Sequence, residues 1–589
     1  MATTHPGGGA SESASESASE SASESAAPLD ALLTQAALGP FRRFFPGRSA
    51  LRLARALAAD PKNLAAWTAS LAADLARVAS GTSGLAPSSR DRRFTDPAWT
   101  SNPLLRRSVQ AYLAAGSAVQ DLVRAAPLDW RDAERVKFAA ENLIEALAPS
   151  NNALLSPVAW KAAIDSGGGS VVTGARQLAR DLASSPRVPA MVPPDAYTVG
   201  GDLAISAGAI VLRTPVFELI QYQPVTETVR ALPLLIVPPT INKYYILDLA
   251  PGRSLIEYLV GQGQQVFVLS WRNPDERHAT WGFDAYVRAI IDALDAVADI
   301  CGAAAVHLTA ACSGGILAAM TASVLSGTAL CAQAEATAGG RARVASLGLL
   351  VTMLDQSRAG TAGALVDETM AEDAIAASAR KGYLDGRTLA EVFAWLRPGD
   401  LIWTYWVNNY LQGRQPPAFD ILFWNADTTR MTAALHRDFV RAAMGNSLAS
   451  PGGVTVLGTE IDLAQLDIDC YAVAGVADHI CPWQACYRSS QLLGGLGHKA
   501  RFVLSTSGHI AALVNPAGNK KASYQVCDGN TADPVDWQRT APIQQGSWWP
   551  DYAAWLAARS GTEVPAPGTP GNDRFRVIEA APGSYVLAS

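Results

Sequence analysis

From about residue 187 onward, short apolar runs alternate with segments whose apolar residues recur at helical spacing. Runs such as 232–237 and 265–270 are apolar on both faces, which is typical of strands buried inside a parallel sheet. Strands and helices that alternate in this way form an α/β fold, in which helices cover a parallel sheet. The other strands expected are 209–212, 217–222, 306–309, 347–353, 470–473 and 502–504, and helices are expected over 283–300 and 315–325.

The chain that precedes this pattern is organised differently. Residues 28–186 repeat apolar side chains at helical spacing and are interrupted by Pro and Gly, so we expect a mostly helical N-terminal domain. Residues 1–27 consist largely of Ser, Glu and Ala repeats with almost nothing to bury, and we expect a disordered tail. Residues 187–589 form the predicted α/β domain. Within it, 354–468 is too long for a simple crossover and is predicted to be a lid over the site.

Composition argues against several classes of protein. The 589 residues are 49% hydrophobic and 17% charged, enough for a large core, and a net charge of −6 without a basic stripe predicts no nucleic-acid partner. The seven cysteines follow no regular spacing, which argues against a disulfide framework. Cys481 and Cys486 have no matching ligand pair, so we expect no metal site. With no secretory signal and no apolar run long enough to span a membrane, the simplest location is the cytoplasm.

One turn carries the sharpest chemical signal, Ala-Ala-Cys-Ser-Gly-Gly at 310–315, between an apolar strand and a helix. A tight turn in this setting lifts a nucleophile above the sheet, and small neighbours leave room for it. We therefore predict that Cys312 is the nucleophile and that the helix N-terminus lowers the pKa of its thiol. Ala310 stands where glycine is usual, so we expect a slightly different turn. A buried cysteine in a glycine-rich turn is the structural alternative.

Two residues at later strand ends complete a possible catalytic triad. In folds with such a turn, the acid follows a later strand and the histidine follows the last one. Asp478 and His509 stand at these two places. His509 would take the proton from Cys312, and Asp478 would hold the imidazole in the useful tautomer. The role of His479 is open, since it could orient Asp478, line the pocket or merely pack.

This chemistry also needs an oxyanion hole. One backbone N–H should come from Ser313, and a second from the loop 238–243, most plausibly from Ile241. The alternative for this loop is a rigid turn set by its two prolines. A cysteine nucleophile suits a thioester donor and an alcohol acceptor, because acyl exchange between thiols is nearly thermoneutral and oxoester formation then runs downhill. Cysteine by itself does not exclude a hydrolase.

Several long stretches between about residues 91 and 550 resemble the poly(3-hydroxyalkanoate) synthases. These are Asn-Pro-Leu at 102–104, Pro-Pro-Thr-Ile-Asn-Lys-Tyr-Tyr at 238–245, Ser-Trp-Arg-Asn-Pro at 270–274, Leu-Arg-Pro-Gly-Asp-Leu-Ile-Trp at 396–403, Phe-Trp-Asn at 423–425, Asp-His-Ile-Cys-Pro-Trp at 478–483 and Ser-Gly-His-Ile at 507–510.

The resemblance implies an α/β-hydrolase core with a lid, preceded by a helical domain. It implies that Cys312, Asp478 and His509 polymerise (R)-3-hydroxyacyl-CoA into a polyester and release coenzyme A. It also implies a single-subunit enzyme that forms a homodimer and works at the surface of polymer granules on a growing polyester chain. We expect no cofactor.

Three questions stay open. The stretches 91–99 and 405–410 look most like medium-chain synthases, although related sequences also take short chains. Arg272, Arg397 and Lys243 could meet coenzyme A phosphates, but ion pairing within the protein explains each of them at least as well. Two other functions remain possible: a thioesterase or depolymerase of the same fold, and a non-catalytic granule-binding protein.

Overall fold

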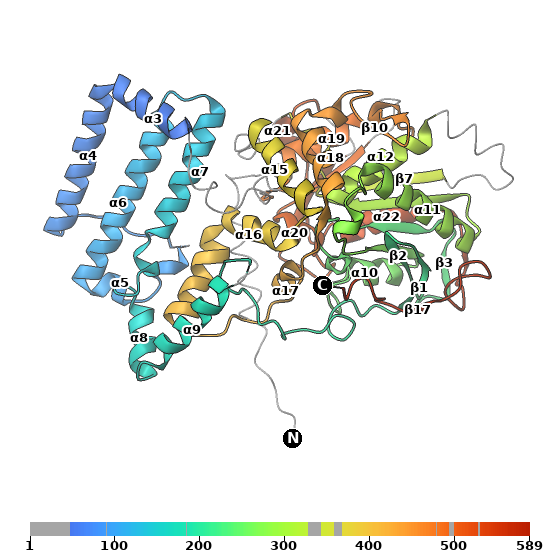
Figure 1. The fold of residues 1–589 in the computed structure, drawn as a ribbon, viewed down its shortest axis with the longest axis horizontal. Coiled ribbons are helices and arrows are strands. Elements are labelled where there is room, and N and C mark those ends of the chain that lie inside the picture. Colours follow the sequence, from blue (N-terminus) through green and yellow to red (C-terminus); the bar gives the residue numbers. More distant parts are fainter. Residues whose placement is uncertain are drawn as a thin grey trace.

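The computed structural model describes residues 48–89, 91–183, 185–327, 343–357, 368–478, 480–493, 500–527 and 531–588. The predicted tail and His479 lie outside these residues. Figure 1 shows two bodies: a group of helices from the first third of the chain, and beside it a large sheet with helices on both faces. No helix in the described ranges is both long and apolar enough to cross a bilayer.

The N-terminal body is helical, as predicted. The sequence supplies caps for its helices. Asn102, just before the helix that begins at Pro103, accepts hydrogen bonds from the N–H groups of Leu104 and Leu105. Gly81, just after the helix that ends at Ser80, adopts the left-handed conformation. The domain boundary at 186 stays a prediction. The helices are α3 (Arg48–Ala59), α4 (Pro61–Ser80), α5 (Ala98–Ser101), α6 (Pro103–Ala125), α7 (Trp130–Ala146), α8 (Pro157–Asp165) and α9 (Gly169–Ala183).

One sheet dominates the second body, with the strand order β15-β14-β13-β12-β7-β6-β4-β5-β2-β1-β17. The six strands from β13 to β5 in this order are parallel, which confirms the predicted α/β fold. The strands are β1 (Gly208–Arg213), β2 (Phe217–Tyr222), β4 (Leu234–Val237), β5 (Val266–Trp271), β6 (Ala305–Ala311), β7 (Arg343–Leu350), β12 (Asp469–Gly475), β13 (Ala500–Ser505), β14 (Ser523–Cys527), β15 (Ile543–Gln545) and β17 (Glu579–Ala580).

Helices cover both faces of this sheet because its central strands are apolar on both sides. In β4, Leu235 and Val237 belong to one hydrophobic core, and Leu234 and Ile236 belong to the other. The first core also contains side chains of α11 (Phe283–Cys301), α12 (Ser313–Ser326) and α19 (Trp483–Leu492). The second contains side chains of α10 (Leu255–Gly261), α20 (His509–Leu513) and α22 (Trp549–Ala557).

One topological prediction was wrong. The strand before His509 is the last parallel strand, but β14 and β15 follow it and extend the sheet as antiparallel strands. Their sequences are partly polar because they lie at the edge of the sheet, and all three residues of β15 are exposed. Two shorter elements outside the sheet are β3 (Thr228–Arg230) and β16 (Glu563–Pro565), which pair with each other.

A long insertion separates β7 from β12. It contains α15 (Glu368–Lys381), β8 (Tyr383–Leu384), α16 (Gly386–Leu396), η6 (Gly399–Trp403), η7 (Trp406–Leu411), α17 (Asp420–Ala426), β9 (Met431–Thr432), α18 (Ala433–Met444), β10 (Thr455–Val456) and β11 (Thr459–Glu460). Both η6 and η7 are π-helices. That the insertion acts as a lid stays a prediction.

The N-terminal body packs on this insertion. Helix α9 lies against η7, and α7 lies against η6. A Cβ atom on Gly174 would stand 2.8 Å from the carbonyl carbon of Tyr410, so the two backbones approach as closely as glycine allows. The hydroxyl of Tyr410 donates to Oδ2 of Asp181 at 2.8 Å, and Nε1 of Trp406 donates to the carbonyl of Asn151 at 3.1 Å.

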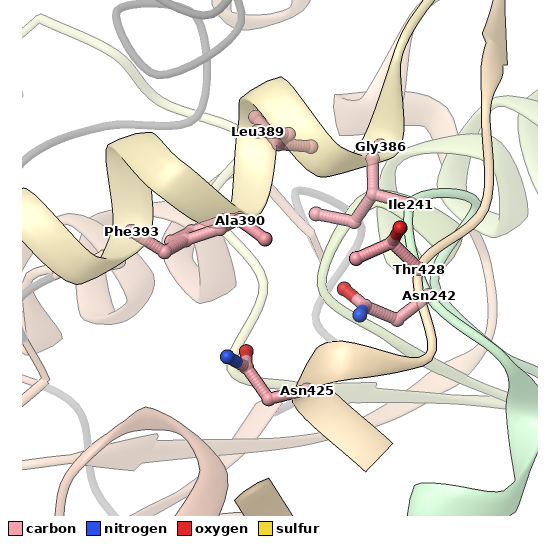
Figure 2. A pocket seen from close by; sticks show the side chains of 8 residues that line it. All are labelled: Ile241, Asn242, Gly386, Leu389, Ala390, Phe393, Asn425 and Thr428. Carbon is pink, nitrogen blue, oxygen red and sulfur yellow. The ribbon is translucent and has the colours of Figure 1, made fainter. Parts of the chain in front are cut away.

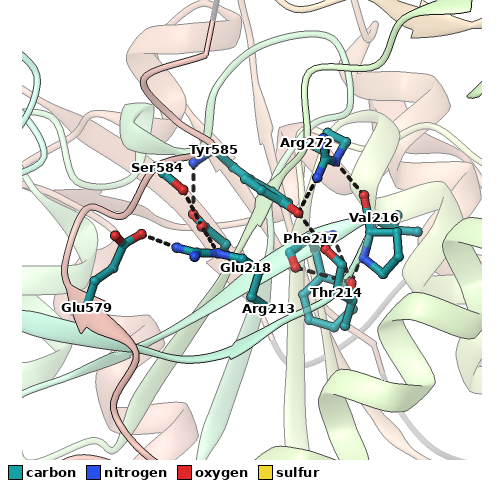
Figure 3. Close-up of polar contacts among 10 residues, drawn as sticks. Arg213, Thr214, Val216, Phe217, Glu218, Arg272, Glu579, Ser584 and Tyr585 are labelled. Carbon is teal, nitrogen blue, oxygen red and sulfur yellow. Dashed lines mark hydrogen bonds and ion pairs between the residues drawn. The ribbon is translucent and has the colours of Figure 1, made fainter. Parts of the chain in front are cut away.

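The end of the chain is fastened to β1 and β2 by a polar network (Figure 3). The buried carboxylate of Glu218 accepts hydrogen bonds from Nε of Arg213 at 2.7 Å, the hydroxyl of Ser584 at 2.9 Å and the backbone N–H of Tyr585 at 2.9 Å. Arg272 donates to the hydroxyl of Tyr585 at 2.6 Å and lies over its ring. These contacts favour the structural explanation of Arg272 over a phosphate contact.

Candidate active site

The predicted turn joins β6 to α12 and places Cys312 at its apex. Cys312 has φ of 50° and ψ of −121°, a backbone conformation that non-glycine residues rarely adopt and that is typical of functional sites. A Cβ atom on Gly314 would stand 2.8 Å from the carbonyl of Val237, and one on Gly315 would stand 2.6 Å from Cγ2 of Thr352. Ala310 stays in regular strand pairing, so the strained residue is the cysteine itself.

Two strand ends beyond this turn supply the other predicted residues. Asp478 follows β12, and His509 begins α20 after β13. Nδ1 of His509 lies 2.7 Å from Oδ2 of Asp478. Oδ1 of Asp478 accepts the backbone N–H groups of Ile480 and Cys481, each at 2.8 Å, so the carboxylate is held on both oxygens. Both side chains are buried.

The imidazole connects the acid to the thiol. Burial alone would lower the pKa of His509, but the Asp478 carboxylate and the neighbouring Cys312 thiol raise this pKa to about 10. The structure therefore brings together the three predicted catalytic side chains around one imidazole. With Nδ1 facing Asp478, Nε2 is the ring nitrogen available to Cys312.

The predicted pKa of Cys312 was wrong in direction. Its interaction with the Cys481 thiol and its burial raise the pKa of Cys312 well above the usual range, and His509 only partly opposes them. The prediction considered only the helix N-terminus behind the sulfur. In the buried site a thiol neighbour and the loss of water outweigh it.

Cys481 is the residue at the site that sequence reasoning missed. It lies three residues after Asp478, is 3% exposed, and its thiol interacts with that of Cys312. The sequence does place it in the stretch that carries Asp478, but only folding brings the loop after β12 against the turn after β6. Cys481 and His509, with Asp478, are also the residues here that could hold a metal ion.

The two predicted oxyanion donors lie on connected segments. The backbone N–H of Thr240 donates to Oγ of Ser313 at 2.9 Å, which ties the loop after β4 to the start of α12. Ile241, next along this loop, is buried, and its carbonyl accepts from the N–H of Thr429 in the insertion at 3.5 Å. That the N–H groups of Ser313 and Ile241 bind an oxyanion stays a prediction.

The basic residues considered for coenzyme A have partners within the chain. Nζ of Lys243 lies 2.8 Å from Oδ1 of Asp427, and Nη2 of Arg397 lies 2.5 Å from Oδ2 of Asp400. The buried Lys243 pair joins the loop after β4 to the insertion, directly after α17. Internal ion pairing therefore accounts for both residues.

A small surface recess lies beside this loop (Figure 2). Figure 2 shows α16 along one side, the loop of Ile241 opposite it, and Asn425 from α17 below. Apolar side chains form most of the wall, with two amide groups among them. The lining residues are Ile241, Asn242, Gly386, Leu389, Ala390, Phe393, Asn425 and Thr428.

Comparison with known proteins agrees with this geometry. Residues 90–259 match the family model described as the N-terminus of poly-beta-hydroxybutyrate polymerase (PhaC), and residues 233–516 match the alpha/beta hydrolase fold model. The fold prediction of an α/β-hydrolase core is thereby confirmed.

Curated relatives extend the match over most of the chain. It is 44% identical over 538 residues to poly(3-hydroxyalkanoate) polymerase 1 of Ectopseudomonas oleovorans, covering 91% of this chain and 94% of that protein. Polymerase 2 of the same organism is 45% identical, with 90% and 92% covered. The polymerase subunit PhaC of Cupriavidus necator is 39% identical, with 85% and 83% covered. The chain belongs to the poly(3-hydroxyalkanoate) polymerase family.

Proposed function

We propose that this polymerase joins (R)-3-hydroxyacyl units from coenzyme A thioesters through a thioester on Cys312, with His509 as general base and Asp478 as its partner. The observation that carries the proposal is the 2.7 Å contact between Asp478 and His509 next to a cysteine held at positive φ. Along the chain Cys312, Asp478 and His509 follow one another in the order nucleophile, acid and histidine that α/β-hydrolase folds use.

The proposed proton path follows from the positions of Cys312, His509 and Asp478. Sγ of Cys312 attacks the thioester carbonyl while its proton resides on Nε2 of His509. The C–S bond to coenzyme A breaks, and the imidazolium protonates the departing thiolate. His509, neutral again, takes the proton of an incoming 3-hydroxyl, whose oxygen attacks the acyl-enzyme and releases the sulfur. Asp478 stabilises each imidazolium.

The oxyanion of each tetrahedral intermediate is assigned to the backbone N–H groups of Ser313 and Ile241. Ser313 opens α12, where first-turn N–H groups have no acceptor within the helix. The hydrogen bond from Thr240 to Ser313 supports a common position for both segments.

Further parts of the proposal follow from the family alone. They are a homodimer of a single-subunit enzyme, a cytoplasmic location at the surface of polymer granules, and turnover without a cofactor. The described residues do not include His479, so its supporting role is proposed only from its place beside Asp478.

The test is coenzyme A release from (R)-3-hydroxyacyl-CoA of increasing chain length, with the product analysed. The proposal expects released coenzyme A and insoluble polyester from the natural chain, and neither of these from Cys312→Ala. Cys470→Ala is the matched control, because Cys470 is an equally buried thiol on β12. Free 3-hydroxy acid would instead identify a hydrolase, and full activity of Cys312→Ala would remove the nucleophile from the proposal.

A further inference from the structure

The segment 424–429 of the insertion lies along the loop after β4. Nε1 of Trp424 donates to the carbonyl of Lys243 at 2.7 Å. Thr428 forms an antiparallel bridge with Asn242, and Figure 2 shows the two side chains next to each other. The insertion therefore supports the loop that carries one of the two proposed oxyanion donors.

Asp427 provides the charged contact within this segment. Its Oδ1 lies 2.8 Å from Nζ of Lys243, and its Oδ2 accepts from the hydroxyl of Tyr245 at 2.9 Å. One carboxylate thus holds two side chains of the same loop, and both of these are buried. A buried ammonium that loses its carboxylate is strongly destabilised, so the loop is stable in this position only while Asp427 stays beside Lys243.

The direction of the donor is fixed by one peptide plane. The carbonyl of Thr240 and the N–H of Ile241 belong to the same planar peptide group, which holds the two bonds in opposite directions. The hydroxyl of Thr429 donates to this carbonyl at 3.4 Å. The N–H of Thr429 donates to the next carbonyl, that of Ile241, at 3.5 Å. A shift of the segment that follows Asp427 would therefore turn the N–H of Ile241.

We propose that Asp427 is a positioning residue for the oxyanion hole. It holds Lys243 and Tyr245, and with them the peptide group whose N–H comes from Ile241, so this donor is aligned only while the insertion is docked. Docking of the insertion and attack on a carbonyl are thereby coupled. The inference rests on the proposed function, because it concerns the alignment of a donor proposed there.

The test compares two reactions of the same sulfur. Acylation of Cys312 by (R)-3-hydroxyacyl-CoA passes through an oxyanion, whereas alkylation by iodoacetamide displaces iodide at a saturated carbon and forms none. Both are followed by the mass of the Cys312 peptide, with acylation measured in single turnovers at saturating acyl-CoA, where the rate does not report substrate binding. We expect Asp427→Ala to slow acylation by about 10- to 100-fold, since a misplaced donor keeps part of its effect, and to change alkylation by less than about twofold.

Asp420→Ala is the matched control. Asp420 begins α17, the helix that ends just before Asp427, and its buried carboxylate pairs with Arg253, ahead of α10. Removing this carboxylate loosens the same helix at its other end, and we expect the acylation rate to stay within about twofold of that of the natural chain. An equal loss in both variants would show a general effect of α17 and overturn the proposal.

The pairing itself is tested by a double-mutant cycle. If Asp427 acts through Lys243, adding Lys243→Met to Asp427→Ala should slow acylation little beyond the single change. Effects that multiply would overturn the proposal, and so would an unchanged acylation rate in Asp427→Ala or an equal slowing of acylation and alkylation.

A second variant covers the case in which Asp427→Ala does not fold, as judged by circular dichroism. Tyr245→Phe removes one contact of the same carboxylate and should slow acylation alone, by about 3- to 10-fold. No selective slowing in this variant would overturn the proposal. A natural chain that is never acylated at Cys312 would instead refute the proposed function.

Discussion

The Asp478 carboxylate offers the sharpest test of the proposed mechanism. Its Oδ2 accepts from Nδ1 of His509, while Oδ1 accepts from two backbone N–H groups. In Asp478→Asn one oxygen stays with the backbone donors, and the amide NH₂ turns toward Nδ1. Nδ1 then becomes an acceptor and the ring proton moves to Nε2, the atom that must take the proton of Cys312.

The size of the effect follows from the basicity that is lost. The Asp478 carboxylate is the largest of the interactions that raise the pKa of His509 to about 10 from an ordinary 6.5. Loss of this basicity together with the tautomer should slow the loading of Cys312 by about three to four orders of magnitude. The assay is a single turnover with acyl-CoA, quenched at intervals, with the acylated protein measured by mass spectrometry.

Asp533→Asn is the matched control. Asp533 also accepts two backbone N–H groups through one oxygen, but it caps α21 (Pro534–Thr540), outside the triad. This variant should load at the wild-type rate. If Asp478→Asn loads Cys312 within about tenfold of the wild type, the carboxylate does not set the tautomer and the reasoning is refuted.

Three further predictions concern the turn, the chain end and the thiols. Gly315→Ala should lower the free energy of unfolding by about 1–3 kcal/mol in urea titrations because its methyl group meets a buried side chain, whereas Gly84→Ala, which meets no atom within 4 Å, should change nothing. Glu218→Gln should cost about 2 kcal/mol in the same titration, because the amide cannot satisfy all three donors; equal stability would show that the network is dispensable. Because Cys481 raises the pKa of the Cys312 thiol, Cys481→Ala should move alkylation of Cys312 to lower pH, measured by peptide mass after iodoacetamide; an unchanged or upward-shifted profile contradicts the assigned cause.

Much of the fold was predictable because its central strands are apolar on both faces. Each of the runs at 232–237, 265–270 and 470–473 overlaps an observed strand, and the turn at 310–315 lies between β6 and α12 as expected. That Cys312, Asp478 and His509 lie close together was predictable for a related reason, since parallel strands bring their carboxyl ends to one edge.

The features that were missed depend on contacts between distant segments. Edge strands such as β14 lack a run of residues that is apolar on both faces, so their sequences cannot be told apart from those of loops. Cys312 and Cys481 interact only because two loops at different strand ends meet in the folded chain. This interaction is also a cause of the raised pKa of the Cys312 thiol. A prediction based on the helix behind the sulfur could not include a thiol 169 positions further along.

The attachment of the helical body has a mechanical consequence. Helices α7 and α9 rest on η6 and η7, and the same insertion supplies α16, one wall of the recess beside Ile241. A displacement of the insertion, which the predicted lid role would require, would therefore carry the helical body with it. Anything that holds those helices still, such as adsorption to a solid surface, would in turn restrain the insertion.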